Sequence, residues 1–338
     1  MIDLSHSRTL ATRVFAAGML LASACGDPAR LTKTKSTTLK NTLFALLGFI
    51  LLSTPLAATA QQSGDFTYTS DGSAITITGY TGPGGAVTIP ATIAGLPVTC
   101  IRDGAFQYKS SLTSTTIQNG VASIGDSAFA HCTSLTDVRI PGSVTSFGGG
   151  PFYDCTSLIA ITVEAANASY ISLDGVLFNK NLTTLIQYPG GKTGSYAIPG
   201  SITSIGNAAF RNCPSLKGVF FKGNAPNFGS GVFIGANNAT VYYLPGTTGW
   251  GATFAGKPTV LWNPLMQTSD PCFGVGPAGF GFNITGTTNI PIVVEACTNL
   301  ANATWVPMQS LYLTNGTFHF SDPDWTNYPA RNYRIRSP

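Results

Sequence analysis

A segment of 23 residues that occurs twice in succession decides the fold: IRDGAFQYKSSLTSTTIQNGVAS at 101–123, then IGDSAFAHCTSLTDVRIPGSVTS at 124–146. A shorter copy follows as FGGGPFYDCTSLIAITV at 147–163, and the same frame returns at 205–221 and again from Phe228. A period of about 20 to 50 residues is the signature of a repeat architecture, in which each unit buries its inner side only against its neighbours. The sequence therefore predicts a solenoid.

Apolar side chains recur at fixed places in each unit, so stacking the units would align them into columns. The SL-x-x-V-x-I stretch alternates like a strand, whereas the AF segment has room only for a short helical turn. Pro-Gly pairs such as Pro141 and Gly142 turn the chain out of the strand. The predicted core columns are Phe106, Phe129, Phe152, Phe210 and Phe233, together with Leu112, Leu135, Leu158 and Leu216.

The full pattern I-G-x-x-A-F-x-x-C-x-S-L, over roughly residues 75–250, resembles the BspA-like, treponemal-type leucine-rich repeats of bacterial surface proteins. The resemblance implies an α/β leucine-rich-repeat solenoid, rich in strands with short helical turns. It also implies a role in adhesion to host or matrix proteins, or to other cells. The stretch 170–196, with LDGVLFNKNLTTLIQYPGGK, departs from the period. Because it resembles inserts of this family, we interpret it as an extra hairpin.

Two further regions flank the solenoid, which is predicted to cover 101–262. Residues 61–100 are predicted to form an N-terminal β cap, in which FTYTSDGSAITITGY places Asp71 and Gly72 at a hairpin turn. In 265–338 the period is lost, and short strand-like runs are divided by Gly, Asn and Pro. These residues predict a small all-β, sandwich-like domain, which resembles C-terminal modules of secreted proteins of environmental bacteria.

Residues 1–60 form the predicted targeting region. Lys33, Lys35 and Lys40 precede the apolar run LFALLGFILL at 43–52, and the small-residue stretch AATA follows at 57–60. This is the three-part layout of a signal peptide, placed at about 33–60 with cleavage after Ala60. The apolar run is about half of the ~20 residues that a membrane span needs. We expect a bacterial protein that is secreted or held at the outer cell surface, with no transmembrane span in the mature chain.

The formal net charge of +4 is concentrated in the targeting region. Six of the 18 Lys and Arg residues and two of the 14 acidic residues lie in 1–60, which leaves 12 of each sign in the rest of the chain. A mature protein without a net basic balance offers no broad footprint for nucleic acid. Nucleic-acid binding is therefore not expected.

Residue types that carry chemistry are sparse. Cys132, Cys155 and Cys213 share one slot in three units, which predicts a ladder of small buried side chains rather than disulfides. Cys272 and Cys297 remain as the possible disulfide. The chain lacks the paired C-x-x-C spacing of zinc sites, so neither a metal nor a cofactor is expected. It has three His residues, which leaves little material for a nucleophile and its base. We expect no enzyme.

Two short motifs near the C-terminus each leave two interpretations open. SDPDW at 321–325 is typical of a turn, with a calcium site as the alternative. Arg331, Arg334 and Arg336 fall on the predicted last strand, where charge protects an exposed edge from pairing. The alternative for these arginines is a contact with the outer membrane or with a sorting partner.

The candidate binding surface consists of the outward positions of the predicted strands, because these side chains do not pack in the core. The aromatic end of this face either binds a partner or is covered by the C-terminal domain or by the insert. We expect a monomeric, non-catalytic protein that binds a protein or glycan ligand. The alternatives are a structural envelope or spacer protein attached through its C-terminal module, and, more remotely, a carbohydrate-active enzyme with two carboxyls facing one cleft. The candidate ligand-binding residues are Asp137, Arg139, Thr162, Phe220, Val241 and Tyr243.

Overall fold

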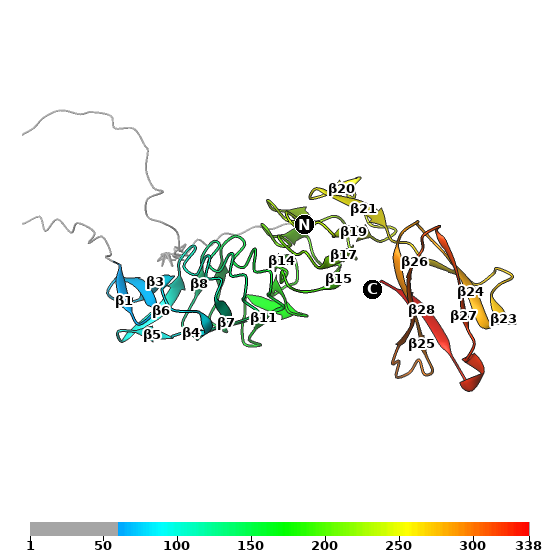
Figure 1. Cartoon of the computed structure of the whole chain (residues 1–338), viewed down its shortest axis with the longest axis horizontal. Helices are drawn as coiled ribbons and strands as arrows, with labels where there is room; N and C mark the ends of the chain where they lie inside the picture. Colours follow the sequence, from blue (N-terminus) through cyan, green and yellow to red (C-terminus); the bar gives the residue numbers. More distant parts are fainter. Residues whose placement is uncertain (1–59, 338) are drawn as a thin grey trace, which may run out of the picture.

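The computed structural model describes residues 60–337, so the predicted signal peptide lies outside the described residues except for Ala60. Strands dominate the described chain, which forms an elongated solenoid followed by two further sheets (Figure 1). Within residues 60–337 there is no α-helix, and the single short 3-10 helix spans Trp325–Asn327. The expected helical turns in the repeats are therefore wrong, and the solenoid is a β-solenoid.

The AF segments form tight turns because alternate backbone N–H groups bond to the next coil and not within their own turn. The N–H groups of Phe106 and Tyr108 donate to the carbonyls of Ala128 and Ala130, at 2.7 and 2.9 Å. Tyr108 has a φ of 64° and its counterpart His131 a φ of 61°. A left-handed residue in every turn interrupts any right-handed helix. The short AF motif is thus a turn that is hydrogen-bonded to the same turn of the next coil.

The N-terminal cap is a hairpin that continues into the solenoid. Strand β1 (Gln61–Ser63) pairs with β2 (Phe66–Ser70), and β2 pairs antiparallel with β3 (Ile75–Tyr80). At the turn, Asp71 Oδ1 accepts the backbone N–H groups of Ser73 and Ala74, both at 2.8 Å. Strand β3 then pairs in parallel with β6 (Leu96–Ile101) of the solenoid.

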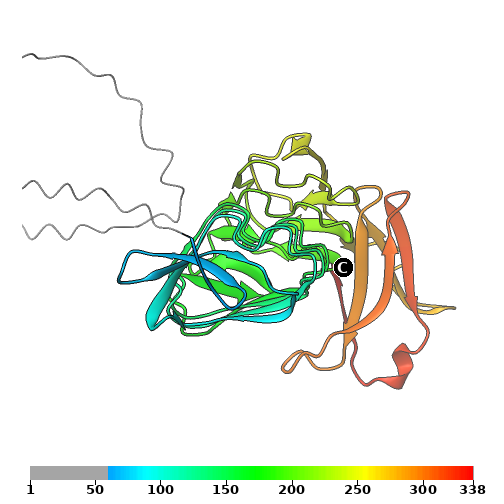
Figure 2. The same ribbon diagram turned by 60° about the vertical axis from the view of Figure 1, so that its left-hand side comes forward.

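Two parallel sheets run along the first half of the solenoid, and Figure 2 shows its successive coils nearly superimposed. Ser146 pairs with Ser123 in one sheet and Ala160 pairs with Asp137 in the other, so neighbouring strands lie 23 residues apart. The sheet that continues from β3 contains β6 (Leu96–Ile101), β8 (Ser123–Ile124) and β10 (Ser146–Phe147), with β5 (Thr92–Ile93) paired to β6. The other sheet contains β4 (Gly85–Ile89), β7 (Leu112–Ile117), β9 (Asp137–Ile140) and β11 (Ala160–Val163).

The insert forms an antiparallel hairpin followed by a shortened coil. Strand β12 (Tyr170–Leu173) pairs with β13 (Val176–Asn179), which pairs with β14 (Thr184–Gln187). Strand β14 then restarts the parallel stack by pairing with β16 (Ser204–Ile205). Because residues 188–191 replace the whole AF turn in this coil, the insert divides the solenoid into two halves, each with its own core.

The second half repeats the same arrangement. Its sheets are β16 with β18 (Asn227–Phe228), and β15 (Gly194–Ile198) with β17 (Leu216–Phe221), β19 (Thr240–Tyr243), β21 (Lys257–Leu261) and β20 (Thr253–Phe254). The nine predicted column residues are all buried in the two cores. The Phe rings stack from coil to coil, with centroids 4.8 Å apart for Phe106 and Phe129 and 5.0 Å for Phe210 and Phe233.

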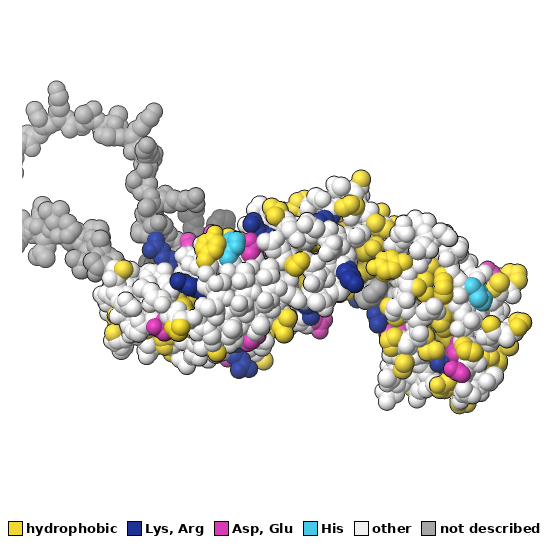
Figure 3. Space-filling view, viewed as in Figure 1, with side chains coloured by type: hydrophobic (Ala, Val, Ile, Leu, Met, Phe, Trp, Pro, Cys, Tyr) yellow, Lys and Arg dark blue, Asp and Glu magenta, His cyan; other side chains and the backbone are white. Residues whose placement is uncertain are grey.

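The strands after Trp262 form two antiparallel sheets, here called the C-terminal sheets (residues 265–336), which face each other across a shared apolar core containing Phe282, Val294 and Phe320. One sheet contains β22 (Leu265–Gln267), β23 (Gly274–Gly276), β24 (Gly279–Thr285) and β27 (Thr317–Asp322); the other contains β25 (Pro291–Cys297), β26 (Val306–Tyr312) and β28 (Asn332–Arg336). In the view of Figure 3, hydrophobic side chains gather over these sheets, while the solenoid surface carries few of them.

The predicted disulfide between Cys272 and Cys297 is wrong, because both cysteines are free. Cys297 is buried at the end of β25, whereas Cys272 is exposed in the loop between β22 and β23 of the other sheet. The arginines of the last strand have internal partners as well. Arg334 Nε and Arg336 Nε both donate to the carboxylate of Glu295, at 2.7 and 2.5 Å.

Candidate binding surface

The candidate residues on β9 and β11 lie on one open face. Asp137, Arg139 and Thr162 are exposed, while Val138 and Ile161 between them are buried. Arg139 pairs in register with Thr162 on one side and with Thr116 on the other. Register partners on neighbouring strands lie about 5 Å apart, so these three side chains form one row across the sheet.

We call this surface the strand face and define it by two rows of outward positions. The face offers hydroxyl groups, one carboxylate and one guanidinium, and Asp137 Oδ2 accepts the hydroxyl of neighbouring Thr136 at 3.2 Å. No ion pair involves Arg139 among the described residues, so its guanidinium is available to a partner. The rows are Ser114, Asp137 and Ala160, and Thr116, Arg139 and Thr162.

The aromatic end of the predicted face is not open. Phe220 is only 4% exposed, because it stacks on Tyr242 and belongs to the core of the C-terminal sheets. Val241 points inward and is fully buried in the second solenoid core. Tyr243 is half-buried and stacks on Trp250, with ring centroids 5.3 Å apart. The predicted exposure of Phe220 and Val241 is therefore wrong.

A single missing residue explains the error at Val241. Gly218 pairs with Thr240 and Phe220 with Tyr242 at a spacing of 22 residues, whereas the preceding strand pair, β15 with β17, has a spacing of 23. Side chains alternate between the two faces of a strand, so a shift of one residue moves every side chain to the opposite face. Tyr242, which the constant period placed in the interior, is consequently the outward residue.

The C-terminal sheets cover these outward aromatics through a firmly held junction. The Trp262 backbone N–H donates to the carbonyl of Tyr243, and its indole Nε1 donates to the carbonyl of Pro291, both at 2.8 Å. Asn263 Oδ1 accepts both the N–H and the hydroxyl of Thr287. Of the two alternatives for the aromatic end, the structure shows coverage by the C-terminal residues.

A second surface, which sequence reasoning missed, lies on the AF turns. Asp154 is buried there and accepts Asn212 Nδ2 at 2.6 Å and Arg211 Nε at 3.1 Å, with His131 Nδ1 at 3.3 Å. His131 stacks on the exposed ring of Tyr108 at 4.5 Å. All these residues stand one or two positions after the repeated Phe, and that recurrence was the available signal.

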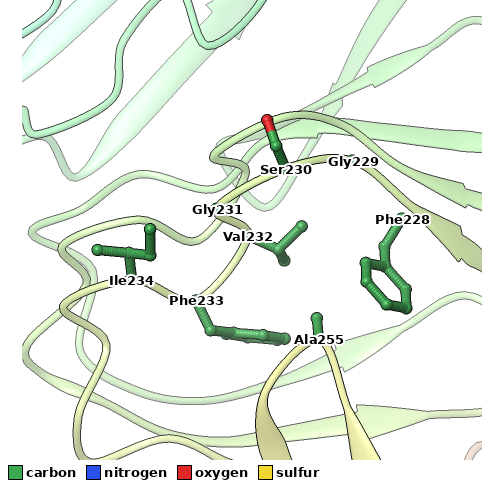
Figure 4. Close-up of a pocket in the computed structure, with 8 residues that line it drawn as sticks. All are labelled: Phe228, Gly229, Ser230, Gly231, Val232, Phe233, Ile234 and Ala255. Carbon is green, nitrogen blue, oxygen red and sulfur yellow. The ribbon is translucent and has the colours of Figure 1, made fainter.

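Two adjoining hollows form a groove beside this row, here called the turn-ridge groove. The first has a volume of about 380 Å³ and is lined by residues of the coils on both sides of the insert, among them Asp126, Tyr153, Asn207, Arg211, Ser230 and Ile234. The second, of about 350 Å³, shares Ser230 and Ile234 and extends to Phe228 and Ala255 (Figure 4). The groove therefore runs across the coils, from a polar end to an apolar end.

The repeat cysteines are structural. Cys132 Sγ and Cys155 Sγ donate to the carbonyls of Phe106 and Phe129, each at 3.1 Å. Burial raises the pKa of the Cys213 thiol well above its ordinary value, which keeps it protonated and unreactive. Within residues 60–337, no group of three or more His, Cys, Asp or Glu residues could hold a metal ion.

The stacked coils and their apolar columns define a leucine-rich-repeat type of solenoid. The family of BspA type leucine rich repeat regions matches the chain at 99–190 and 188–249, with six copies. The repeat region therefore consists of BspA-type leucine-rich repeats. A comparison with curated protein sequences finds no match.

Among solved structures, the chain is similar to the leucine rich repeat protein of T. pallidum, with 26% identity over 55% of this chain and 86% of that one, at a TM-score of 0.39. The pneumococcal vaccine antigen PcpA shows 20% identity over 54% and 70% of the two chains, at a TM-score of 0.31. A leucine rich cell surface protein of Faecalibacterium prausnitzii shows 22% identity over 54% and 76%, at a TM-score of 0.28. The described part of the chain contains no helix long and apolar enough to span a membrane.

Proposed function

We propose that this protein is exported and acts as a monomeric surface recognition protein, which binds a partner protein through the strand face. The single observation that carries the proposal is the alternation on β9 and β11, where exposed polar side chains flank buried apolar ones. Outward residues of a solenoid are free to serve recognition because packing does not constrain them. The function needs no catalytic residue and no cofactor.

Export is supported by the sequence before the described chain. The basic residues, the apolar run at 43–52 and the small residues at 57–60 follow the layout of a signal peptide. BspA-type repeats at 99–249 accord with a place on the cell surface or in the medium. N-terminal sequencing of the protein recovered from the producing bacterium tests this step, and a first residue at Gln61 is the expected result.

Binding is tested with the protein immobilised and screened against extracellular-matrix proteins and intact bacterial cells. Replacing Arg139 by Ala removes the free guanidinium, and Thr162→Arg places a bulky side chain in the same row. Each substitution should weaken a captured interaction by about tenfold or more, as expected for a central contact. Ser146→Arg is the matched control, because Ser146 is exposed on the other sheet of the solenoid. Equal binding by all three variants would contradict the proposal.

A second candidate function is structural, with the solenoid as a spacer attached to the envelope through an all-β C-terminal domain at 265–338. The hydrogen bonds of Trp262 and Asn263 across the junction favour it, since a spacer must hold its ends in a fixed relation. Deleting 265–338 should then release the protein into the medium. Because the deletion uncovers Phe220 and Tyr242, the truncated chain should carry Ser at both positions to stay soluble. Retention at the envelope would exclude attachment through this segment.

A further inference from the structure

The turn-ridge groove is separate from the strand face, because it lies on the turns that connect the two sheets of each coil. Its residues come from the coils on both sides of the insert's shortened coil, at 126–153 and 207–234, and continue along the solenoid to the next coil. A groove in this direction accommodates an extended ligand, one segment of which meets each coil. The side chains that line the groove determine which kind of ligand it can bind.

One wall carries polar side chains that each keep one atom for a ligand. Asp126 Oδ1 accepts the Gly149 N–H at 2.6 Å, and Asn207 Oδ1 accepts the Ser230 N–H at 2.9 Å. These bonds fix both side chains in place. The other carboxylate oxygen of Asp126 and the amide nitrogen of Asn207 have no hydrogen-bond partner among the described residues. The wall thus offers one acceptor and one donor in fixed positions.

The groove lining also contains a cationic and an aromatic side chain, Arg211 and Tyr153. The Arg211 guanidinium lies over the ring of Tyr153, 4.9 Å from the centroid. Its Nε donates to Asp154, while its terminal nitrogens have no hydrogen-bond partner among the described residues. Asp154 already neutralises Arg211 and Asp126 adds a carboxylate, so the groove has no surplus positive charge to attract an anion. The ligand it fits is polar and carries no negative charge.

The far end of the groove is apolar and open to solvent. Phe228 is 52% exposed and Ile234 is 56% exposed, on either side of the second hollow (Figure 4). Large apolar side chains exposed together beside a concavity mark a binding surface. A suitable ligand therefore has apolar faces as well as hydrogen-bonding edges.

An extended peptide cannot join this groove as an added strand. A peptide that binds as an added strand needs free backbone groups along the edge that it joins. Here the backbone is occupied by the coil ladder, since the Ser127 N–H donates to Gly149 and the Ala208 N–H donates to Ser230. Recognition at the groove must therefore use side chains, and the carboxylate oxygen of Asp126 and the amide nitrogen of Asn207 are able to pair with hydroxyl groups.

We propose that the turn-ridge groove binds a neutral oligosaccharide that lies along the solenoid axis. The hydroxyl groups of its sugars pair with Asp126, Asn207 and Arg211, and the C–H faces of its sugars pack on Phe228 and Ile234. Pyranose rings combine these two kinds of surface, in agreement with the polar wall and the apolar end. The site does not depend on the strand face, and a protein partner bound there leaves the groove free.

The test is saturation-transfer NMR of the protein with neutral hexasaccharides of glucose, mannose, xylose and N-acetylglucosamine. At least one should receive saturation from the protein, and its affinity is then measured by calorimetry. Asn207→Asp keeps the oxygen that holds Ser230 but removes the free donor, and Phe228→Ala removes the apolar contact. Each should lower the affinity by about tenfold.

Ile159→Ala is the control for Phe228→Ala, because Ile159 is 57% exposed and lies away from the groove. It should leave the affinity unchanged, as should Thr162→Arg on the strand face. The proposal is overturned if no hexasaccharide receives saturation, or if Asn207→Asp and Phe228→Ala bind as the unmodified protein does. Either result leaves the binding of a protein at the strand face unaffected, so the two proposals fail separately.

Discussion

Phe220 and Tyr242 stack face to face, with ring centroids 4.5 Å apart and an interplanar angle of 10°. They are register partners on neighbouring strands of the solenoid, yet they belong to the apolar core of the C-terminal sheets. Trp262 lies between the solenoid and the C-terminal sheets. Its ring packs edge-on against Phe220, with ring centroids 6.0 Å apart, and its indole donates to the carbonyl of Pro291. The end of the solenoid and the C-terminal sheets are therefore joined through a common core.

Truncating this pair should loosen the junction. The double substitution of Phe220 and Tyr242 by Ala removes two buried rings, and such truncations cost about 3–5 kcal/mol each when the site cannot collapse. We expect a protease to cleave the variant near residues 262–264 under conditions that leave the unmodified protein intact. Tyr108→Ala is the control, since Tyr108 is exposed on a distant turn. Equal resistance of the double variant would show that the linker bonds alone hold the junction.

The repeat columns were predictable because the same apolar positions recur in each unit and pack against the same positions of the neighbouring units. All nine predicted residues are buried. The face of Val241 was not predictable from the period, since one deleted residue reverses the alternation. Likewise, the cover over Phe220 depends on contacts with residues more than 60 positions away, such as Phe282. The tight AF turns were not predictable, because the sequence does not reveal that alternate N–H groups bond to the next coil.

Phe129→Ala should be among the most damaging substitutions in the solenoid. The ring is fully buried between Phe106 at 4.8 Å and Phe152 at 5.4 Å, so its loss leaves a cavity that two stiff neighbours cannot fill. We expect the free energy of unfolding in urea to fall by about 3–5 kcal/mol. The exposed Ile159→Ala should change it by no more than about 0.5 kcal/mol. A small loss at Phe129 would refute the column as the source of stability.

Glu295 should make the C-terminal sheets sensitive to acid. Burial disfavours its charged form, but hydrogen bonds from Arg336 and Arg334 outweigh burial and hold the pKa of its carboxyl below the ordinary value. A carboxyl with a lowered pKa in the folded state stabilises the fold above its unfolded pKa of about 4.3. That contribution is lost as the pH falls through the lower folded pKa.

The measurement is the free energy of unfolding at a series of pH values between neutrality and strong acid. The unmodified protein should lose stability below about pH 4, while Glu295→Gln should be less stable at neutral pH and should lose less on acidification. Asp137→Asn, on the exposed strand face, is the matched carboxyl control and should follow the unmodified protein. Parallel pH curves for Glu295→Gln and the unmodified protein would contradict the assignment.

Asp154 should couple the two halves of the solenoid. The shortened coil of the insert removes the turn that would otherwise connect the flanking AF segments, and Asp154 instead bonds to Arg211 and Asn212 of the following unit. Removing one partner of a buried charged pair is costly, but Arg211 is one-third exposed and solvent compensates part of the loss. Asp154→Ala should therefore cost about 1–3 kcal/mol.

The sharper readout is cooperativity, because repeat proteins unfold as units coupled through their interfaces. With Asp154 replaced, the urea transition should broaden, and its slope should fall as the two cores begin to unfold separately. A double-mutant cycle with Arg211→Ala measures the coupling between the two side chains directly. Asp137→Ala serves as the control for loss of a carboxylate. If Asp154→Ala and Asp137→Ala unfold with the same midpoint and slope, the two halves of the solenoid are held together by backbone packing and not by this carboxylate.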